Sequence, residues 1–308
     1  MLKKIKELFI PQQLLKGNCG IEREMLRVDK NGYLSFTDHP GIFGDKVLNP
    51  YITTDFSESQ VEIITPALDK IEETYSFSKA LYDIVALEIG DEILWPQSMP
   101  CFIPEDDEIP VAKYSEEGRE AEEYRNKLLK KYGGKKQLIS GIHYNYSFNE
   151  EIIRKLYESS DKELTYKEYK NSIYLKVARN YLRYRWIIVY LLGAAPVIHE
   201  SFLNGCSCKL KQISEDGYTV DGAVSHRNGE CGYRNKEELY PNYDTVEDYV
   251  ESINKYVNDG VIDSYKELYS QVRLKAKNPK NFLNSLLEDG ISYLEYRSID
   301  INPFEKGG

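Results

Sequence analysis

The sequence predicts an α+β fold built around a mainly antiparallel sheet. Segments with the two-residue alternation of strands occur both singly and between helices of unequal length. No regular strand–helix–strand repeat, internal repeat or low-complexity tract runs through the chain, which disfavours a doubly wound parallel sheet. The 308 residues, 41% of them hydrophobic, can bury a sizeable core, and composition alone does not choose between one large domain and two modest ones.

The first third of the chain is predicted to hold two helices and two extended segments. A short amphipathic helix comes before Pro11, and Asn31-Gly32 marks a turn after the first strand. Asp69 with Glu72 three residues later has the form of a capping box, so a helix is expected to begin at Asp69. The extended segments are residues 18–29 and 51–64.

Proline and glycine divide the rest of the chain. Residues 100–112 are acidic and bounded by prolines, which indicates an exposed loop. Residues 206–242 are irregular and glycine-rich, as active-site loops often are. A charged helix is expected to end at Gly133-Gly134, because glycine commonly terminates helices. The remaining expected elements are helices over 115–132, 171–192, 245–258 and 279–287 and strands over 137–148 and 291–299.

Charge and hydropathy argue against two classes of partner. The formal net charge is -10, whereas a protein that holds nucleic acid by its phosphates normally carries a basic excess. The longest apolar stretch, residues 186–198, is shorter than the ~20 residues that span a bilayer. The N-terminus lacks the apolar core and cleavage site of a signal peptide. We therefore expect a cytoplasmic protein without a nucleic-acid or membrane partner; the sequence gives no oligomeric state.

Five cysteines are scattered along the chain, and their spacing predicts neither a disulfide framework nor a zinc site. Reduced thiols are the expected state for such cysteines in a cytosolic protein. The five are Cys19, Cys101, Cys206, Cys208 and Cys231.

Three predicted strands each carry a small polar set on one face and bulky side chains on the other, because successive residues of a strand point to opposite sides. The polar sets are Glu22 with Glu24 on the first strand, Gly141, His143, Asn145 and Ser147 on the middle strand, and Glu295 with Arg297 on the last. Asp55 and Glu62 add two carboxylates from the second extended segment. Any one such pair is more often a solvated face, and a lone histidine is more often a hydrogen-bonded core residue.

The combination of these sets indicates a divalent-metal site. Clustered carboxylates repel one another, so they persist on one face when cations neutralise them. Oxygen ligands with one imidazole suit Mg²⁺ or Mn²⁺, whereas zinc more often recruits thiolates or several histidines. Magnesium bound by carboxylates usually completes its coordination with water and substrate phosphate, which fits an ATP-using phosphoryl-transfer enzyme. The phosphate-loop motif and the protein-kinase motifs are both absent, so metals and arginines would hold the phosphates.

Six segments resemble bacterial glutamate–cysteine ligase, also called γ-glutamylcysteine synthetase, in the same order along the chain. The segments are GIEREMLRVDKNG at 20–32, ITTDFSESQVEIITP at 52–66, LWPQSMPCFI at 94–103, YRNKLLKKYGGKKQLISGIHYNYSF at 124–148, YLKVARNYLRYRWIIVYLLGAAPV at 174–197 and YLEYRSIDINPF at 293–304. The resemblance implies a glutamine synthetase-like fold, with a curved, mainly antiparallel sheet and flanking helices. It also implies ATP and Mg²⁺, or Mn²⁺, bound inside the sheet.

The resemblance implies roles for particular residues. The metal positions are Glu22, Glu24, Asp55, Glu62, His143 and Glu295. Arg297 and Arg227 match the arginines that meet glutamate or the transferred phosphoryl group. Phe56, Tyr132 and Tyr233 match positions around the cysteine pocket, with Gln137 and Asn145 as further substrate-side candidates. The stretch that contains Arg227 and Tyr233, SHRNGECGY at 225–233, keeps the family's arginine and Gly-Tyr but differs in the middle.

The implied activity joins the γ-carboxyl of L-glutamate to the amine of L-cysteine through γ-glutamyl phosphate, as the first step of glutathione biosynthesis. Residues 1–308 would form a single catalytic domain that lacks the family's C-terminal helical portion. Either a truncated gene or the front of a fused, glutathione-making enzyme would end in this way. Two alternatives stay open: a glutamate–amine ligase with another amine acceptor, and an inactive fragment that keeps the scaffold.

Overall fold

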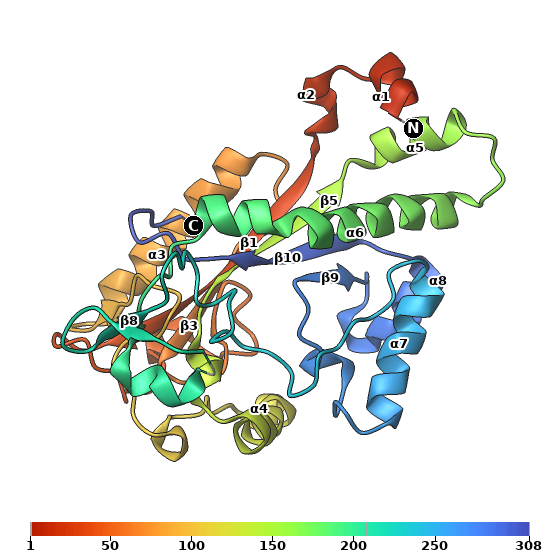
Figure 1. Ribbon diagram of the computed structural model, residues 1–308. Helices are drawn as coiled ribbons and strands as arrows, with labels where there is room; N and C mark the ends of the chain where they lie inside the picture. The colour runs from red at the N-terminus through yellow and green to blue at the C-terminus, as the bar shows by residue number, and fades with distance from the viewer. Residues whose placement is uncertain (1, 207, 308) are drawn as a thin grey trace.

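A twisted antiparallel sheet runs through the centre of the protein (Figure 1). The computed structural model describes residues 2–206 and 208–307. Seven strands form this sheet in the order β2-β3-β1-β5-β10-β9, and β4 pairs with β1 beside that path. Their bounds are β1 Gly17–Val28, β2 Ile52–Thr54, β3 Gln60–Ile64, β4 Ile93–Leu94, β5 Ile142–Phe148, β9 Val272–Lys275 and β10 Tyr293–Ile299. The α+β class with a mainly antiparallel sheet is thereby confirmed.

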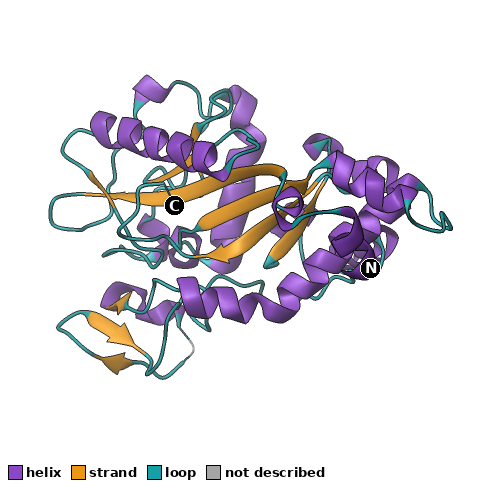
Figure 2. Cartoon of the chain, turned by 90° about the horizontal axis from the view of Figure 1, so that it is seen from above, coloured by secondary structure: helices purple, strands orange, loops and turns teal. Residues whose placement is uncertain are grey.

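Helices flank the sheet, and a second, smaller sheet stands apart from it (Figure 2). The helices are α1 Leu2–Leu8, α2 Pro11–Leu14, α3 Ile71–Glu88, α4 Arg119–Tyr132, α5 Glu150–Glu158, α6 Tyr166–Leu192, α7 Val246–Asn258 and α8 Phe282–Asp289. The smaller sheet has the order β6-β8-β7, with β6 Ile198–His199, β7 Lys211–Gln212 and β8 Gly217–Thr219. In the described part of the chain, no helix is long and apolar enough to cross a membrane.

The apolar face of the central sheet is covered by α3 and α6. Leu81 and Val85 of α3 share a buried cluster with Ile21 of β1. On α6, the ring of Tyr181 lies 4.6 Å from that of Tyr296 on β10. The same face continues to the β9 edge, where α7 and α8 pack in one cluster with β9 and β10. These contacts leave the opposite, polar face of the sheet free to form a site.

Several predicted elements differ in their bounds. The segment 51–64 divides into two antiparallel strands, β2 and β3, because residues 55–59 turn the chain back on itself. The strand expected over 137–148 starts only at Ile142, after a 3-10 helix over Lys135–Leu138. Helix α6 begins five residues earlier than expected, where Thr165 and Glu168 form a capping box. The elements α5, β9 and the smaller sheet were not predicted.

Two local predictions are wrong. Asp69 does not cap α3, because the N-cap residue is Lys70 and no side chain accepts a capping hydrogen bond there. The segment 100–112 is not wholly exposed, since Cys101, Ile103 and Ile109 are buried in a hydrophobic cluster. The end of α4 is as predicted: Gly133 follows Tyr132 with φ of 80°, a left-handed conformation that glycine adopts at little cost.

Candidate active site

The register of the central sheet gathers the predicted metal residues on one face. Glu24 is the Cα partner of Glu62 across β1 and β3, and Glu22 is the partner of His143 across β1 and β5. On the next strand, Glu295 faces Asn145. Directly opposed residues of an antiparallel pair project to the same side. Strands from separate parts of the chain therefore present one polar surface.

His143 lies at the centre of a close group of carboxylates. Its Nδ1 is 3.2 Å from Glu22 Oε2 and 3.7 Å from Glu295 Oε1, and its Nε2 is 3.8 Å from Glu24 Oε1. One ligand atom each from Glu22, His143 and Glu295 lies within 4.8 Å of the others. This spacing and this set of donor atoms fit one divalent cation.

Two carboxyl groups of this face have raised pKa values. Burial and the negative charge of Asp55 raise the pKa of Glu24 to about 7. Burial, followed by the charges of Asp55, Glu22 and Glu24, raises the pKa of Glu62 well above its usual value. A bound cation would reverse this repulsion, because it favours the ionised carboxylates. Mg²⁺ or Mn²⁺ therefore fits the electrostatics as well as the geometry.

Glu295 is in a different electrostatic environment on the same face. Burial opposes ionisation, but the positive charges of Lys275 and Arg297 outweigh it, so the pKa of Glu295 falls well below its usual value. Lys275 Nζ lies 3.2 Å from Glu295 Oε1, whereas the buried Glu295 Oε2 has no hydrogen-bond partner in the described part of the chain. This ionised carboxylate thus keeps one oxygen free for a ligand.

A cavity of about 200 Å³ lies beside the carboxylates. Two of its lining carboxylates come from one end of the order β2-β3-β1-β5-β10-β9, and two of its arginines come from the other end. Asp55 follows β2 and Glu24 lies on β1, while Arg297 and Arg273 lie on β10 and β9. The aromatic and amide side chains that line it are Tyr124, Gln137, Tyr233 and Tyr269.

Guanidinium groups at this cavity carry hydrogen-bond donors without partners. Arg227 is 94% buried, and its Nη1 has no acceptor. Nε and Nη1 of Arg297 and Nε of Arg273 are also buried and have no partner within residues 2–206 and 208–307. Buried charged donors are costly to leave unpaired. The cavity is therefore suited to anionic groups such as phosphate and carboxylate.

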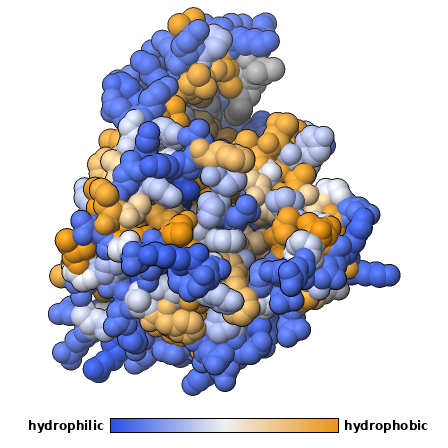
Figure 3. All heavy atoms as spheres, turned by 90° about the vertical axis from the view of Figure 1, so that its left-hand side faces the viewer, coloured by the Kyte–Doolittle hydropathy of each residue, from blue (hydrophilic) through white to orange (hydrophobic). Residues whose placement is uncertain are grey.

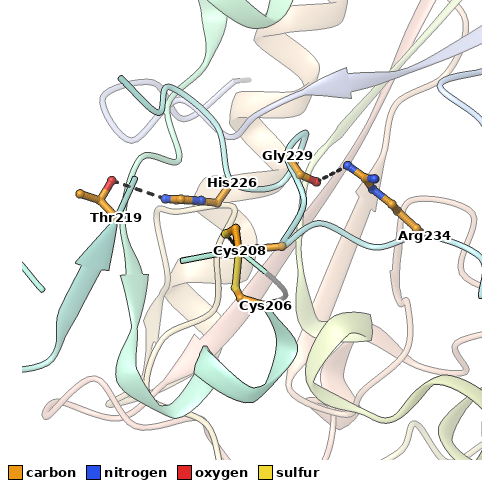
Figure 4. Close-up of a disulfide and its surroundings, with 7 residues drawn as sticks. Cys206, Cys208, Thr219, His226, Gly229 and Arg234 are labelled. Carbon is orange, nitrogen blue, oxygen red and sulfur yellow. Dashed lines mark hydrogen bonds between the residues drawn. A yellow bond between two sulfur atoms is a disulfide. The ribbon is translucent and has the colours of Figure 1, made fainter. Parts of the chain in front are cut away.

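The loop that carries Arg227 and Tyr233 is tied to neighbouring segments (Figure 4). Cys231 in this loop is disulfide-bonded to Cys206, and Cys208 Sγ lies 3.4 Å from Cys231 Sγ. Gly229 O accepts a 2.9 Å hydrogen bond from Arg234 Nη2. The expectation of reduced thiols is wrong for Cys206 and Cys231, which are 25 residues apart and meet only through folding.

Some of the predicted substrate residues lie at the cavity or beside the metal group, and others lie behind the cavity wall. Gln137 and Tyr233 line the cavity, and Asn145 Nδ2 donates to Glu22 Oε1 at 2.8 Å. Tyr132 lies behind Tyr233, with ring centroids 5.8 Å apart, and its hydroxyl donates to Glu267. Phe56 is not among the lining residues, because it is buried in the hydrophobic cluster that also contains Leu138 and Ile139.

Sequence reasoning missed the lining residues Tyr124, Tyr269 and Arg273, as well as Lys275 beside Glu295. Arg273 and Lys275 alternate with Val272 and Leu274 on the four-residue strand β9. This alternation could have indicated a polar face, but a pattern over only four residues is hard to distinguish from a chance arrangement.

The sequence model of the glutamate–cysteine ligase family matches residues 2–260 and 254–308. The chain belongs to this family. Among curated relatives of the chain, the bifunctional glutathione biosynthesis protein GshAB of Clostridium perfringens is 45% identical over 310 residues, and that of Desulfotalea psychrophila is 44% identical over 301. These matches cover 100% and 97% of this chain but 40% and 38% of the relatives, so the chain spans about two fifths of their length.

Two solved structures have the same fold as the chain. A bifunctional glutathione synthetase from Pasteurella multocida superposes with a TM-score of 0.84 at 35% identity, covering 96% of this chain and 37% of that one. A glutamate–cysteine ligase from Francisella tularensis, in complex with AMP, superposes with a TM-score of 0.85 at 30% identity, covering 95% and 63%. The fold expected from the family resemblance is therefore confirmed.

Proposed function

We propose that the chain joins the γ-carboxyl of L-glutamate to the amine of L-cysteine at the expense of ATP, the first step of glutathione biosynthesis. The family and the names of its relatives support this reaction. The observation that carries the proposal is one cavity where carboxylates and an imidazole adjoin unpaired arginine donors. Such a site can hold metal ions, phosphate and an amino acid together.

The metal positions in this proposal are Glu22, Glu24, Asp55, Glu62, His143 and Glu295. Mg²⁺, or Mn²⁺ in its place, would neutralise charge on the phosphates of ATP when bound there. Asn145 holds Glu22 by its 2.8 Å hydrogen bond, and the backbone N–H of Gly141 donates to Glu24 Oε2 at 2.9 Å. These bonds orient carboxylates that would otherwise rotate.

The chemistry assigned to the chain is phosphoryl transfer followed by amide formation. A carboxylate does not acylate an amine in water, because its oxygen is a poor leaving group. Transfer of the γ-phosphoryl group of ATP to glutamate gives γ-glutamyl phosphate, which the amine of cysteine attacks with loss of phosphate. Arg297 and Arg227 would stabilise the negative charge on the moving phosphoryl group. Phe56, Tyr132 and Tyr233 would form or support the cysteine pocket, with Gln137 and Asn145 as further substrate-side residues.

The chain is further proposed to act as one catalytic unit in the cytoplasm, where ATP is available. Residues from both ends of the chain share the central sheet, which supports a single domain over 1–308. The net charge of -10 supports small-molecule substrates over nucleic acid.

The test is phosphate release from ATP with Mg²⁺ and glutamate, with and without cysteine. We expect cysteine-dependent release, with lower activity for glycine and putrescine. Glu295→Gln removes a charge from the metal group and should lower turnover on the order of 10²–10³-fold. Glu288→Gln, at an exposed position of α8, is the matched control and should leave turnover unchanged. Near-normal turnover in folded Glu295→Gln would refute the metal assignment.

A further inference from the structure

Arg273 is a third arginine at the cavity, beyond the two assigned to the phosphoryl group. It lies on β9, the edge strand next to β10, and is the Cα partner of Glu295. Its Nη2 donates to the backbone oxygens of Lys266, at 2.9 Å, and Leu268. These two bonds hold the guanidinium in place while its buried Nε has no partner.

The surroundings of Arg273 are aromatic and cationic. Tyr124, Tyr233 and Tyr269 line the same cavity, and Lys136 and Lys266 add positive charge. Besides Glu24 and Asp55 of the metal group, one further carboxylate, Glu267, lines it. Glu267 is already engaged, since Lys131 Nζ lies 2.6 Å from its Oε1 and the backbone N–H of Asp263 donates to its Oε2 at 2.7 Å.

This arrangement favours an anionic ligand over a cationic one. Arg297 lies beside Arg273, and burial together with the charge of Arg297 lowers the pKa of Arg273. Two close guanidinium groups are stabilised when anions lie between or beside them. A diamine would be repelled by both guanidinium groups, and the nearby Glu267 and Glu295 are already paired with Lys131 and Lys275.

We propose that Arg273 binds the carboxylate of the amine-donating substrate and so selects an amino acid over a simple amine. The inference rests on the proposed function, because it assigns the acceptor end of that same site. With Arg227 and Arg297 assigned to the phosphoryl group and glutamate in the proposed function, Arg273 is the remaining guanidinium among the residues that line the cavity. A guanidinium–carboxylate pair is strong when both groups are removed from water.

The test compares L-cysteine with cysteamine, which has the same thiol and amine but no carboxylate. The wild-type chain should use cysteine with a kcat/KM higher by on the order of 10–100-fold, the range expected for one charge-assisted contact. Arg273→Gln should raise the KM for cysteine by a similar factor. It should leave kcat/KM for cysteamine and the KM for glutamate nearly unchanged. Arg273→Lys should restore part of the preference.

Arg183→Gln is the matched control, because Arg183 is exposed on α6 and does not line the cavity. A merely structural role for Arg273 would lower activity with both acceptors equally and would overturn the inference. So would a preference for cysteine that survives in Arg273→Gln, or a KM change confined to glutamate. If the wild-type chain ligates cysteine and cysteamine equally well, the inference alone fails. If the wild-type chain ligates neither acceptor, the proposed function fails, and the inference that rests on it fails as well.

Discussion

At the scale of single residues, identical side chains on one sheet face differ in protonation because their neighbours differ. Glu24 has a pKa of about 7, raised by burial and by Asp55, whereas Lys275 and Arg297 lower that of Glu295. A bound cation therefore stabilises the ionised form of the carboxylates near Asp55 most, whereas Glu295 is ionised without a cation. A site arranged in this way can accept metal ions while keeping at least one anionic ligand ready.

His39 is a buried histidine away from the cavity that should affect stability in acid. Neither ring nitrogen has a hydrogen-bond partner among the described residues, and burial with the charges of Lys46 and Arg27 lowers its pKa to about 4. The unfolded chain, with a histidine pKa near 6.5, takes up this proton first as the pH falls. The free energy of unfolding should therefore decrease between about pH 6.5 and 4.

Urea denaturation of the wild type and of His39→Phe would measure this effect. The variant keeps a ring beside Phe43, whose centroid lies 5.5 Å from that of His39. Its unfolding free energy should fall less steeply over that pH window, since other titrating groups are common to both proteins. Parallel curves would show that His39 does not carry the effect.

At the scale of elements, β1 separates the core from the site. Ile21 and Met25 point into the cluster beneath α3, while Glu22 and Glu24 point to the polar face. Arg23, on the apolar side, is accommodated because its Nη1 donates to Glu305 O at 2.9 Å and its guanidinium lies over the ring of Tyr82. Both faces of this strand are therefore constrained, and a shift of one residue in register would bury its glutamates.

The start of β5 and the loop after β8 approach closely at Gly141. A Cβ added there would lie 2.1 Å from Arg227 Nη2, so Gly141→Ala must displace the Arg227 guanidinium. We expect turnover to fall on the order of 10²-fold, because small displacements of catalytic groups are costly. The melting temperature should change little, since the flexible end of the arginine moves.

Gly41→Ala is the matched control for this substitution, because its added Cβ would have nothing within 4 Å. Steady-state kinetics would measure the turnover of both variants, and thermal melting would measure their stability. Full activity in Gly141→Ala would mean that Arg227 does not need its present position.

At the scale of the whole molecule, one side of the central sheet is covered by packed helices, whereas the other side carries the polar site next to a second hydrophobic cluster that includes Leu26 and Phe56. The outer surface mixes hydrophilic side chains with smaller hydrophobic patches over the face in Figure 3, as most protein surfaces do. The polar atoms that stand out are instead the buried donors of Gln137, Arg227, Arg273 and Arg297 at the cavity, which have no hydrogen-bond partner among the described residues. The site is thus distinguished by burial of charge rather than by exposed apolar area.

Metal binding should stabilise the whole fold, because the proposed ligands come from β1, β3, β5 and β10. A ligand at 100 times its Kd contributes about 2.7 kcal/mol. With ~2–4 °C per kcal/mol, Mg²⁺ should raise the melting temperature by several degrees, and a chelator should reverse the rise. Glu295→Gln should lose most of this shift and Glu288→Gln should keep it. Equal melting-temperature shifts with Mg²⁺ in both variants would mean that the metal binds at another site.

Much of the candidate site could be predicted because strand alternation is a local property. Glu22, Glu24, His143 and Glu295 follow from period-two patterns within single segments, and the structure does bring them together. The bounds of β1 and α4 were predicted within a residue or a few, since glycine and turn signals lie next to them in the chain. The family resemblance supplied the roles that alternation alone left open.

The tertiary structure decided what depends on partners distant in sequence. Arg273 enters the site only because the short strand β9 pairs with β10, and Lys275 reaches Glu295 for the same reason. The bond between Cys206 and Cys231 and the burial of Phe56 likewise result from packing. Alternation determines which side of a strand a residue faces, whereas strand pairing and burial are collective and determine what it meets there.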